Sequence, residues 1–166
     1  MVLNYIMFKF YPLRTIKGIE NNLLKVIKKN KENLILDKNV IYPESHNKVE
    51  RPWFNNAYFH DSMMMIKGER FIDIYNNKTN QIDKIFMSPF EIYINNQLLY
   101  NELCVLVLNP GSYFRIVSGS KKNESLNLHY SYKFKGLNSY NVIDIDNNNK
   151  MYLLRKENIW KQDKTI

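Results

Sequence analysis

The stretch HDSMMMIKGERFIDIY, residues 60–75, decides the fold class of this chain. It contains an apolar run, a glycine at position 68 that can form a hairpin turn, and a run in which apolar and polar residues alternate. A period of two is typical of a β-strand with one buried face. A second stretch, LVLNPGSYFRIVSG at residues 106–119, has the same arrangement around a Pro-Gly turn. The sequence therefore predicts a hairpin around Gly68 and two strands joined by a Pro-Gly turn in the second stretch.

Short runs of this kind continue along the chain from about Ala57, at intervals of eight to twelve residues. The expected strands are Met63–Lys67, Arg70–Tyr75, Ile82–Met87, Glu91–Asn95, Leu103–Leu108, Tyr113–Ser118, Ser125–Phe134, Asn141–Ile145 and Met151–Leu154. Turn-forming residues separate them, among them Gly68, Asn95-Asn96 and Asn109-Pro-Gly111. Many evenly spaced short strands predict a mainly β sandwich, jelly roll or small barrel.

The first third of the chain has a different pattern. The residues Ile16, Ile19, Leu23, Leu24 and Ile27 form one apolar stripe at helical spacing, and Thr15 can cap its start. The segment from Asp37 to Ser45 is typical of an extended connection. We therefore predict an N-terminal helical segment with its connection over residues 1–51 and a β-rich domain over residues 52–166, forming one structural unit.

Length and composition indicate one domain. The 166 residues are 45% hydrophobic and 14% aromatic, which is enough for a core and favours strands. The single cysteine, Cys104, lies in an apolar run, so we expect a buried and unreactive thiol. No stretch approaches the length of a membrane-spanning helix and the N-terminus does not resemble a signal peptide, so we expect a cytoplasmic protein.

The net charge of +8 is confined to the two ends. Residues 1–51 carry ten Lys and Arg against five Asp and Glu, residues 52–149 carry nine of each, and residues 150–166 carry five against two. A nucleic-acid site on the central domain would concentrate cations there. Lysines near the end of the expected helix also suit its dipole. Nucleic acid is therefore expected only through the basic ends.

The two stretches quoted above resemble the two motifs of the cupin superfamily over roughly Pro52 to Phe134. The first motif ends in a strand, a Gly turn and another strand, and the second has Pro and Gly shortly before a ligand histidine. The resemblance implies a jelly roll, also called a double-stranded β-helix, behind the N-terminal helical segment. It places the metal ligands of the family near Phe54, Asn56, Asp61 and Phe114. Two of these are phenylalanines, so we expect no metal and no other cofactor.

The resemblance is to metal-free cupins, which include sugar-nucleotide epimerases and isomerases as well as barrels that only bind ligands or partners. It implies a His base, and His60 with a carboxylate nearby is the candidate. Arg70 and Arg115 are candidates for holding a phosphate or carboxylate. The other ligand-binding candidates are His129, on the polar face of its strand, and Tyr58, in an aromatic group beside His60.

Each candidate has a structural alternative. His60 can be a half-exposed residue at a strand start, the two arginines can be surface groups, the polar face of His129 can face solvent, and the aromatic group around Tyr58 can pack against the helix. We predict a metal-independent cupin-like protein that binds, and in one interpretation epimerises or isomerises, a small polar ligand such as a sugar nucleotide. The alternative is a non-catalytic interaction protein, viral in one interpretation, whose basic ends contact nucleic acid or an acidic partner. In both cases we expect a homodimer, because exposed sheet edges are often buried by pairing.

Overall fold

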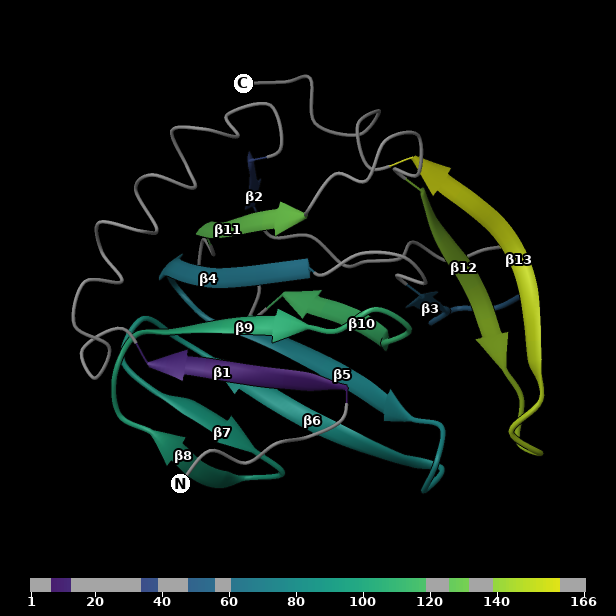
Figure 1. Ribbon diagram of the computed structural model, residues 1–166, viewed down its shortest axis with the longest axis horizontal. Helices are drawn as coiled ribbons and strands as arrows, with labels where there is room; N and C mark the ends of the chain where they lie inside the picture. The colour runs from purple at the N-terminus through teal and green to yellow at the C-terminus, as the bar shows by residue number, and fades with distance from the viewer. Residues whose placement is uncertain are drawn as a thin grey trace.

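The computed structural model describes residues 7–12, 34–38, 48–55, 61–118, 126–131 and 139–158, and these form a mainly β structure (Figure 1). The described residues contain thirteen strands and no helix. The strands are β1 (Phe8–Pro12), β2 (Leu34–Lys38), β3 (Trp53–Asn55), β4 (Asp61–Lys67), β5 (Arg70–Asn76), β6 (Gln81–Met87), β7 (Ile92–Ile94), β8 (Gln97–Tyr100), β9 (Cys104–Leu108), β10 (Tyr113–Ser118), β11 (Leu126–Ser131), β12 (Ser139–Ile145) and β13 (Met151–Asn158). The helix expected around Ile16–Ile27 lies outside the described residues.

The strands form two antiparallel sheets. The five-stranded sheet has the order β1-β9-β4-β11-β2, and the eight-stranded sheet has the order β13-β12-β3-β10-β5-β6-β7-β8. In Figure 1 the first sheet lies towards the viewer and the second lies mostly behind it. The prediction of a mainly β fold is confirmed.

Four pairings are nested inside one another along the chain. Strand β2 pairs with β11, β3 with β10, β4 with β9, and β5 with β6. Consecutive strands from β2 to β5 alternate between the two sheets. The hairpin β7–β8 extends the larger sheet beyond β6, and the hairpin β12–β13 extends it beyond β3. The chain thus follows the path of one long hairpin folded over on itself.

The larger of the two hydrophobic clusters, which we call the core, lies between the two sheets, and a smaller one of Trp53, Tyr75 and Ile143 lies outside it. We call the side of the eight-stranded sheet that contributes to this core its inner face, and the opposite side its outer face. Alternate residues of β5 and β10 point inwards, because strand side chains alternate between faces. The largest apolar side chains that are fully buried are Phe8, Met63, Met65, Ile72, Ile74, Ile85, Met87, Ile92, Leu106, Leu108 and Phe114. The interior is therefore densely apolar.

Two predicted turns are confirmed in detail. Asn95 and Asn96 connect β7 to β8 with φ values of 50° and 65°, the pair of positive values that a type I′ hairpin turn requires. Gly111 has a φ of 83° in the turn from β9 to β10, where the Ser112 amide donates a 3.1 Å hydrogen bond to the Asn109 carbonyl. This turn carries the chain from the five-stranded to the eight-stranded sheet. The Ser112 hydroxyl also donates a 2.6 Å bond to the Met7 carbonyl and so ties the start of β1 to the same corner.

The turn at Gly68, whose φ is 75°, also carries the chain from the five-stranded to the eight-stranded sheet. The hairpin predicted at Gly68 is therefore wrong: β4 and β5 follow one another along the chain but pair with other strands in different sheets.

All nine strands expected from the sequence are present, with small shifts at their ends. Four strands were not expected, namely β1, β2, β3 and β8. Strands β1 and β2 come from the segment predicted to be helix and connection, and both belong to the five-stranded sheet. The cause is not local to these segments: β1 and β2 obtain their hydrogen bonds from β9 and β11, which are distant in the sequence.

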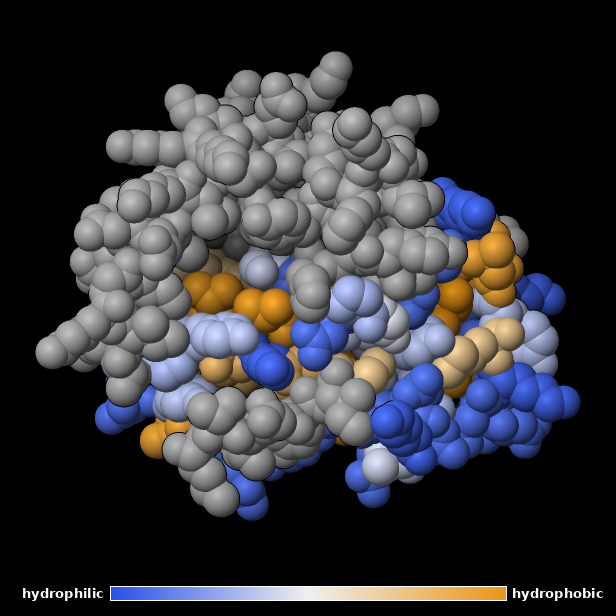
Figure 2. Space-filling model, in the orientation of Figure 1, coloured by the Kyte–Doolittle hydropathy of each residue, from blue (hydrophilic) through white to orange (hydrophobic). Residues whose placement is uncertain are grey.

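The polar turns of the larger sheet gather at one end of the molecule. Residues 77–80, between β5 and β6, and residues 147–150, between β12 and β13, are exposed. Figure 2 shows hydrophilic surface at the lower right, where these two turns lie in Figure 1. Within the described ranges no helix could cross a membrane.

Candidate functional site

Three of the four positions that the cupin resemblance assigns to metal ligands are described, and all three are buried. Phe54 and Phe114 are 5% and 1% exposed, and their ring centroids are 5.6 Å apart. Asp61 is also buried, and Asn56 lies outside the described residues. The described parts of the chain bring no three His, Cys, Asp or Glu side chains together in a group that could hold a metal ion. Phe54 and Phe114 thus pack against each other in the core between the two sheets.

The two predicted arginines lie on opposite faces of the same sheet. Arg70 shares the inner face of β5 with Ile72 and Ile74, and it is fully buried. Arg115 lies on β10 directly opposite Asp73, and its side chain is 18% exposed on the outer face. One small ligand cannot contact both groups, so the structure does not bring these two candidates together.

The remaining candidates are less completely described. The backbone of His129 lies in β11 and pairs with Met63 and Ile35, but its side chain is outside the description. Tyr58 and His60 lie outside the described residues. The roles of His60 as a base and of Tyr58 and His129 as ligand contacts stay predictions from the sequence.

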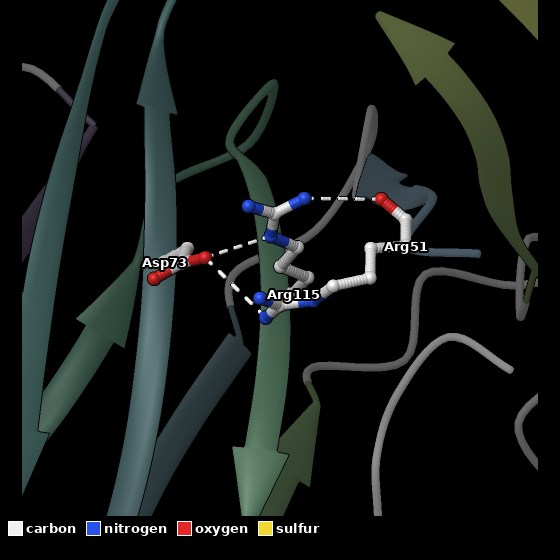
Figure 3. A network of polar contacts seen from close by, with 3 residues as sticks. All are labelled: Arg51, Asp73 and Arg115. Atoms are coloured by element: carbon white, nitrogen blue, oxygen red, sulfur yellow. Dashed lines mark hydrogen bonds and ion pairs between the residues drawn. The ribbon is translucent and has the colours of Figure 1, made fainter. Parts of the chain in front are cut away.

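The outer face carries a compact charged group that we call the Arg115 cluster, made of Arg51, Trp53, Asp73 and Arg115. The Arg115 Nε donates a 2.7 Å hydrogen bond to the Asp73 Oδ2, and the Arg115 Nη1 donates a 3.1 Å bond to the Arg51 carbonyl. The Arg51 Nη2 lies 3.5 Å from the same Asp73 oxygen. Figure 3 shows both guanidinium groups directed at this one carboxylate. Strands β5 and β10 supply Asp73 and Arg115 in register, and Arg51 precedes β3.

Aromatic side chains pack against the Arg115 cluster and fix its position. The guanidinium carbon of Arg115 lies 4.2 Å from the centroid of the Trp53 ring, a cation–π contact. Trp53 packs against Tyr75 at 5.9 Å, and Tyr75 packs edge-on against Tyr113 at 6.3 Å. The Tyr75 hydroxyl lies 2.8 Å from the Asn80 Oδ1 and 3.2 Å from the Asn149 Oδ1, within the two polar turns. Burial, followed by the neighbouring Tyr113, raises the pKa of Tyr75, so this hydroxyl stays protonated.

The cluster has a surplus of positive charge, because two guanidinium groups share one carboxylate. Lys84 adds an exposed cation opposite Asp73 on β6. Among the described residues, none makes a hydrogen bond to the Arg115 Nη2. A planar guanidinium with an unused N–H edge is well suited to a carboxylate or phosphate oxygen.

A second outer-face feature adjoins the cluster, and we call it the aromatic row. It consists of Phe71, Phe86 and Tyr93, which lie opposite one another on β5, β6 and β7. Their ring centroids are 5.2 Å apart for Phe71 and Phe86 and 5.8 Å apart for Phe86 and Tyr93. Phe71 is 42% exposed. Because it lies two residues before Asp73 on β5, it faces the same side, and the row borders the charged cluster.

Sequence reasoning missed Arg51, Trp53 and Asp73 as partners of Arg115. Alternation along β5 and β10 does indicate that Asp73 and Arg115 each lie on the less apolar side of a strand. Their contact depends on the register between two strands about 40 residues apart, which periodicity does not give. Cys104, in contrast, is buried as predicted, and burial together with Glu102 raises the pKa of its thiol to about 12.

Comparison with known proteins returns no significant similarity: no family model, curated protein or solved structure matches this chain.

Proposed function

We propose that this chain is a metal-independent jelly-roll domain that binds a small polar ligand of the sugar class on the outer face of its eight-stranded sheet. The nested pairing of β2 with β11, β3 with β10, β4 with β9 and β5 with β6 supports the jelly-roll interpretation. In a jelly roll, eight such strands form two packed antiparallel sheets. Fold alone does not assign a function, so the proposal rests on the site.

The contrast between the two faces carries the proposal. On the inner face Phe54 and Phe114 fill the interior, together with apolar side chains from both sheets. On the outer face the Arg115 cluster and the aromatic row lie side by side, and both include partly exposed side chains. Phe71 is 42% exposed and the Arg51 side chain is 48% exposed on this face, so a ligand can contact both from the solvent.

The outer face offers the two kinds of contact that a sugar needs. Aromatic rings present flat apolar surfaces against which the C–H face of a sugar ring can pack. Charged and polar side chains beside them can exchange hydrogen bonds with its hydroxyl groups and fix its orientation. Phe71 supplies the exposed ring, and Asp73 and Arg115 supply the acceptor and the donors.

Binding without catalysis fits the described residues, because the Arg115 cluster contains no histidine and its one carboxylate, Asp73, is already engaged by two arginines. Isomerisation through His60 stays a separate prediction from the sequence. Contact of the basic ends with nucleic acid is the competing function, and the same experiment tests it.

The test is a thermal-shift screen of the whole chain against free sugars and nucleotide sugars, with a short DNA duplex and single-stranded RNA alongside. A ligand that binds only the folded state raises the melting temperature. We expect a rise with at least one sugar for the wild type and for Phe90→Ala, a matched loss of an exposed ring outside the row. Phe71→Ala should lose that rise. A rise with nucleic acid alone, lost in high salt, would contradict the proposal.

A further inference from the structure

We infer that the ligand is acidic, and that its carboxylate or phosphate group binds between Arg115 and Arg51. This inference rests on the proposed function, because it names the chemical class of the sugar bound at the same face. The Arg115 cluster thereby becomes the anion subsite and the aromatic row the subsite for the sugar ring.

Arg115 is preorganised for this role. Its guanidinium is held at Nε by Asp73, at Nη1 by the Arg51 carbonyl, and on one flat side by Trp53. These contacts fix the plane of the group and leave Nη2 without a hydrogen bond to any described residue. A donor whose orientation is already fixed loses little conformational entropy when a ligand binds.

Arg51 is the exposed and more weakly held partner. Its side chain is 48% exposed, whereas that of Asp73 is 14% exposed. Its 3.5 Å separation from Asp73 is long compared with the 2.7 Å bond that Arg115 makes to the same oxygen. An exposed ion pair of this kind contributes little to stability. Arg51 can therefore turn from Asp73 to a bound anion at small cost.

The charge balance of the cluster favours an anion over a neutral ligand. Both arginines share the Asp73 carboxylate, and Arg115 already makes the short hydrogen bond to it. The exposed Lys84 lies opposite Asp73 on β6. A neutral sugar leaves this surplus uncompensated, whereas a carboxylate group compensates part of it and a doubly charged phosphate group compensates more.

The spacing of the two subsites suits a single ligand. Phe71 and Asp73 are two residues apart on β5, a Cα separation of about 7 Å in an extended strand. A sugar that packs on Phe71 can thus place an acidic substituent at the neighbouring guanidinium groups. Free phosphate fits the anion subsite alone.

The experiment is an NMR titration of the ¹⁵N-labelled chain with glucose, glucuronate, glucose 6-phosphate and inorganic phosphate, following the Arg115 Nε–H signal. We expect glucuronate and glucose 6-phosphate to shift this signal and to bind at least about tenfold more tightly than glucose, since hydrogen bonds to charged groups are the stronger class. Arg51→Gln should remove most of this preference. Lys78→Gln, which removes an exposed cation from the β5–β6 turn, should keep it.

Each result decides one claim. Equal affinity for glucose and its two acidic counterparts, lost in Phe71→Ala, overturns the acidic-ligand inference and leaves sugar binding intact. Inorganic phosphate that binds as tightly as glucose 6-phosphate keeps the anion subsite and overturns the sugar class. Absence of any shift with all four probes overturns both. If Arg115→Lys folds, it should weaken glucuronate binding as Arg51→Gln does, because lysine lacks the planar fork.

Discussion

Arg70 and Arg115 lie on neighbouring strands of one sheet, yet their surroundings are opposite. Arg70 is fully buried on the inner face beside Ile72 and Ile74, whereas Arg115 lies on the outer face between Trp53 and Asp73. The two faces of the eight-stranded sheet thus differ in burial and in the contacts they make. The inner face supplies the core and so stability, and we propose that the outer face supplies binding.

The largest expected difference between the faces concerns phenylalanine truncation. Phe114→Ala should lower the free energy of unfolding by about 3–5 kcal/mol, because it leaves a cavity beside Phe54 in the core. Phe71→Ala should cost about 1 kcal/mol or less, because that ring is 42% exposed. Urea denaturation measures both, and unchanged m-values would show that the unfolding transition remains comparable. Similar losses for the two variants would contradict the assignment of the faces.

A smaller effect is expected within the Arg115 cluster. Asp73→Asn should lower the free energy of unfolding by about 1–2 kcal/mol, because Arg115 loses its charged partner at a largely buried position. Asp83→Asn is the matched control. Asp83 accepts a 2.9 Å bond from the Asn95 Nδ2 at an exposed site, and the replacement amide can still accept it. A loss in the control as large as in Asp73→Asn would show that the cluster has no special role.

The corner between the sheets provides the next test. Gly111 has a φ of 83°, and a Cβ added there would have nothing within 4 Å. Gly111→Ala should therefore cost about 1 kcal/mol through backbone strain alone. Thermal unfolding of the wild type and the variant, at the same pH and scan rate, measures this loss of stability. A cost several times larger would mean that the corner is more tightly packed than described, and no cost would mean that the turn changes conformation freely.

The smallest effect is a pH dependence that arises in the core, at Cys104 on β9. The Cys104 thiol has its pKa raised from 9.0 to about 12 in the folded state. Above pH 9 the unfolded chain releases this proton and the folded chain keeps it, so the unfolded state is favoured as pH rises. Stability should fall by less than about 1 kcal/mol between pH 8 and 9.5 through this group. Cys104→Ala should remove that part of the slope in urea titrations, and an unchanged slope would contradict it.

Local features of the sequence predicted most of the fold. The period-two runs gave nine strands, and Asn95-Asn96 and Pro110-Gly111 marked turns whose backbone angles need those residues. Strand β8 has the sequence QLLY, without alternation, and it was missed. Strands β1 and β2 were missed because their partners lie about 90 to 100 residues away in the sequence.

The candidate site was less accessible to sequence reasoning. Alternation groups Arg70 with Ile72 and Ile74 and therefore contained a signal that Arg70 is buried. Alternation sorts the residues of one strand into two faces, but it does not show which face of the assembled sheet a ligand could reach. Asp73 and Arg115 required the register of β5 with β10, and Arg51 required the path of the chain before β3. A contact between distant strands depends on tertiary structure, so pattern alone could not provide it.

The most direct test of the central claim is to locate the ligand. The measurement is an NMR titration with glucuronate. The protein is labelled at the Ile and Leu methyl groups and at the side-chain nitrogens of arginine and tryptophan, so that both faces are observed in one experiment. Binding on the outer face should shift the Arg115 Nε–H and Trp53 indole signals and leave the methyl signals of Ile72, Ile74 and Leu106 unchanged. Shifts confined to those three core residues would place the ligand between the sheets and contradict binding on the outer face.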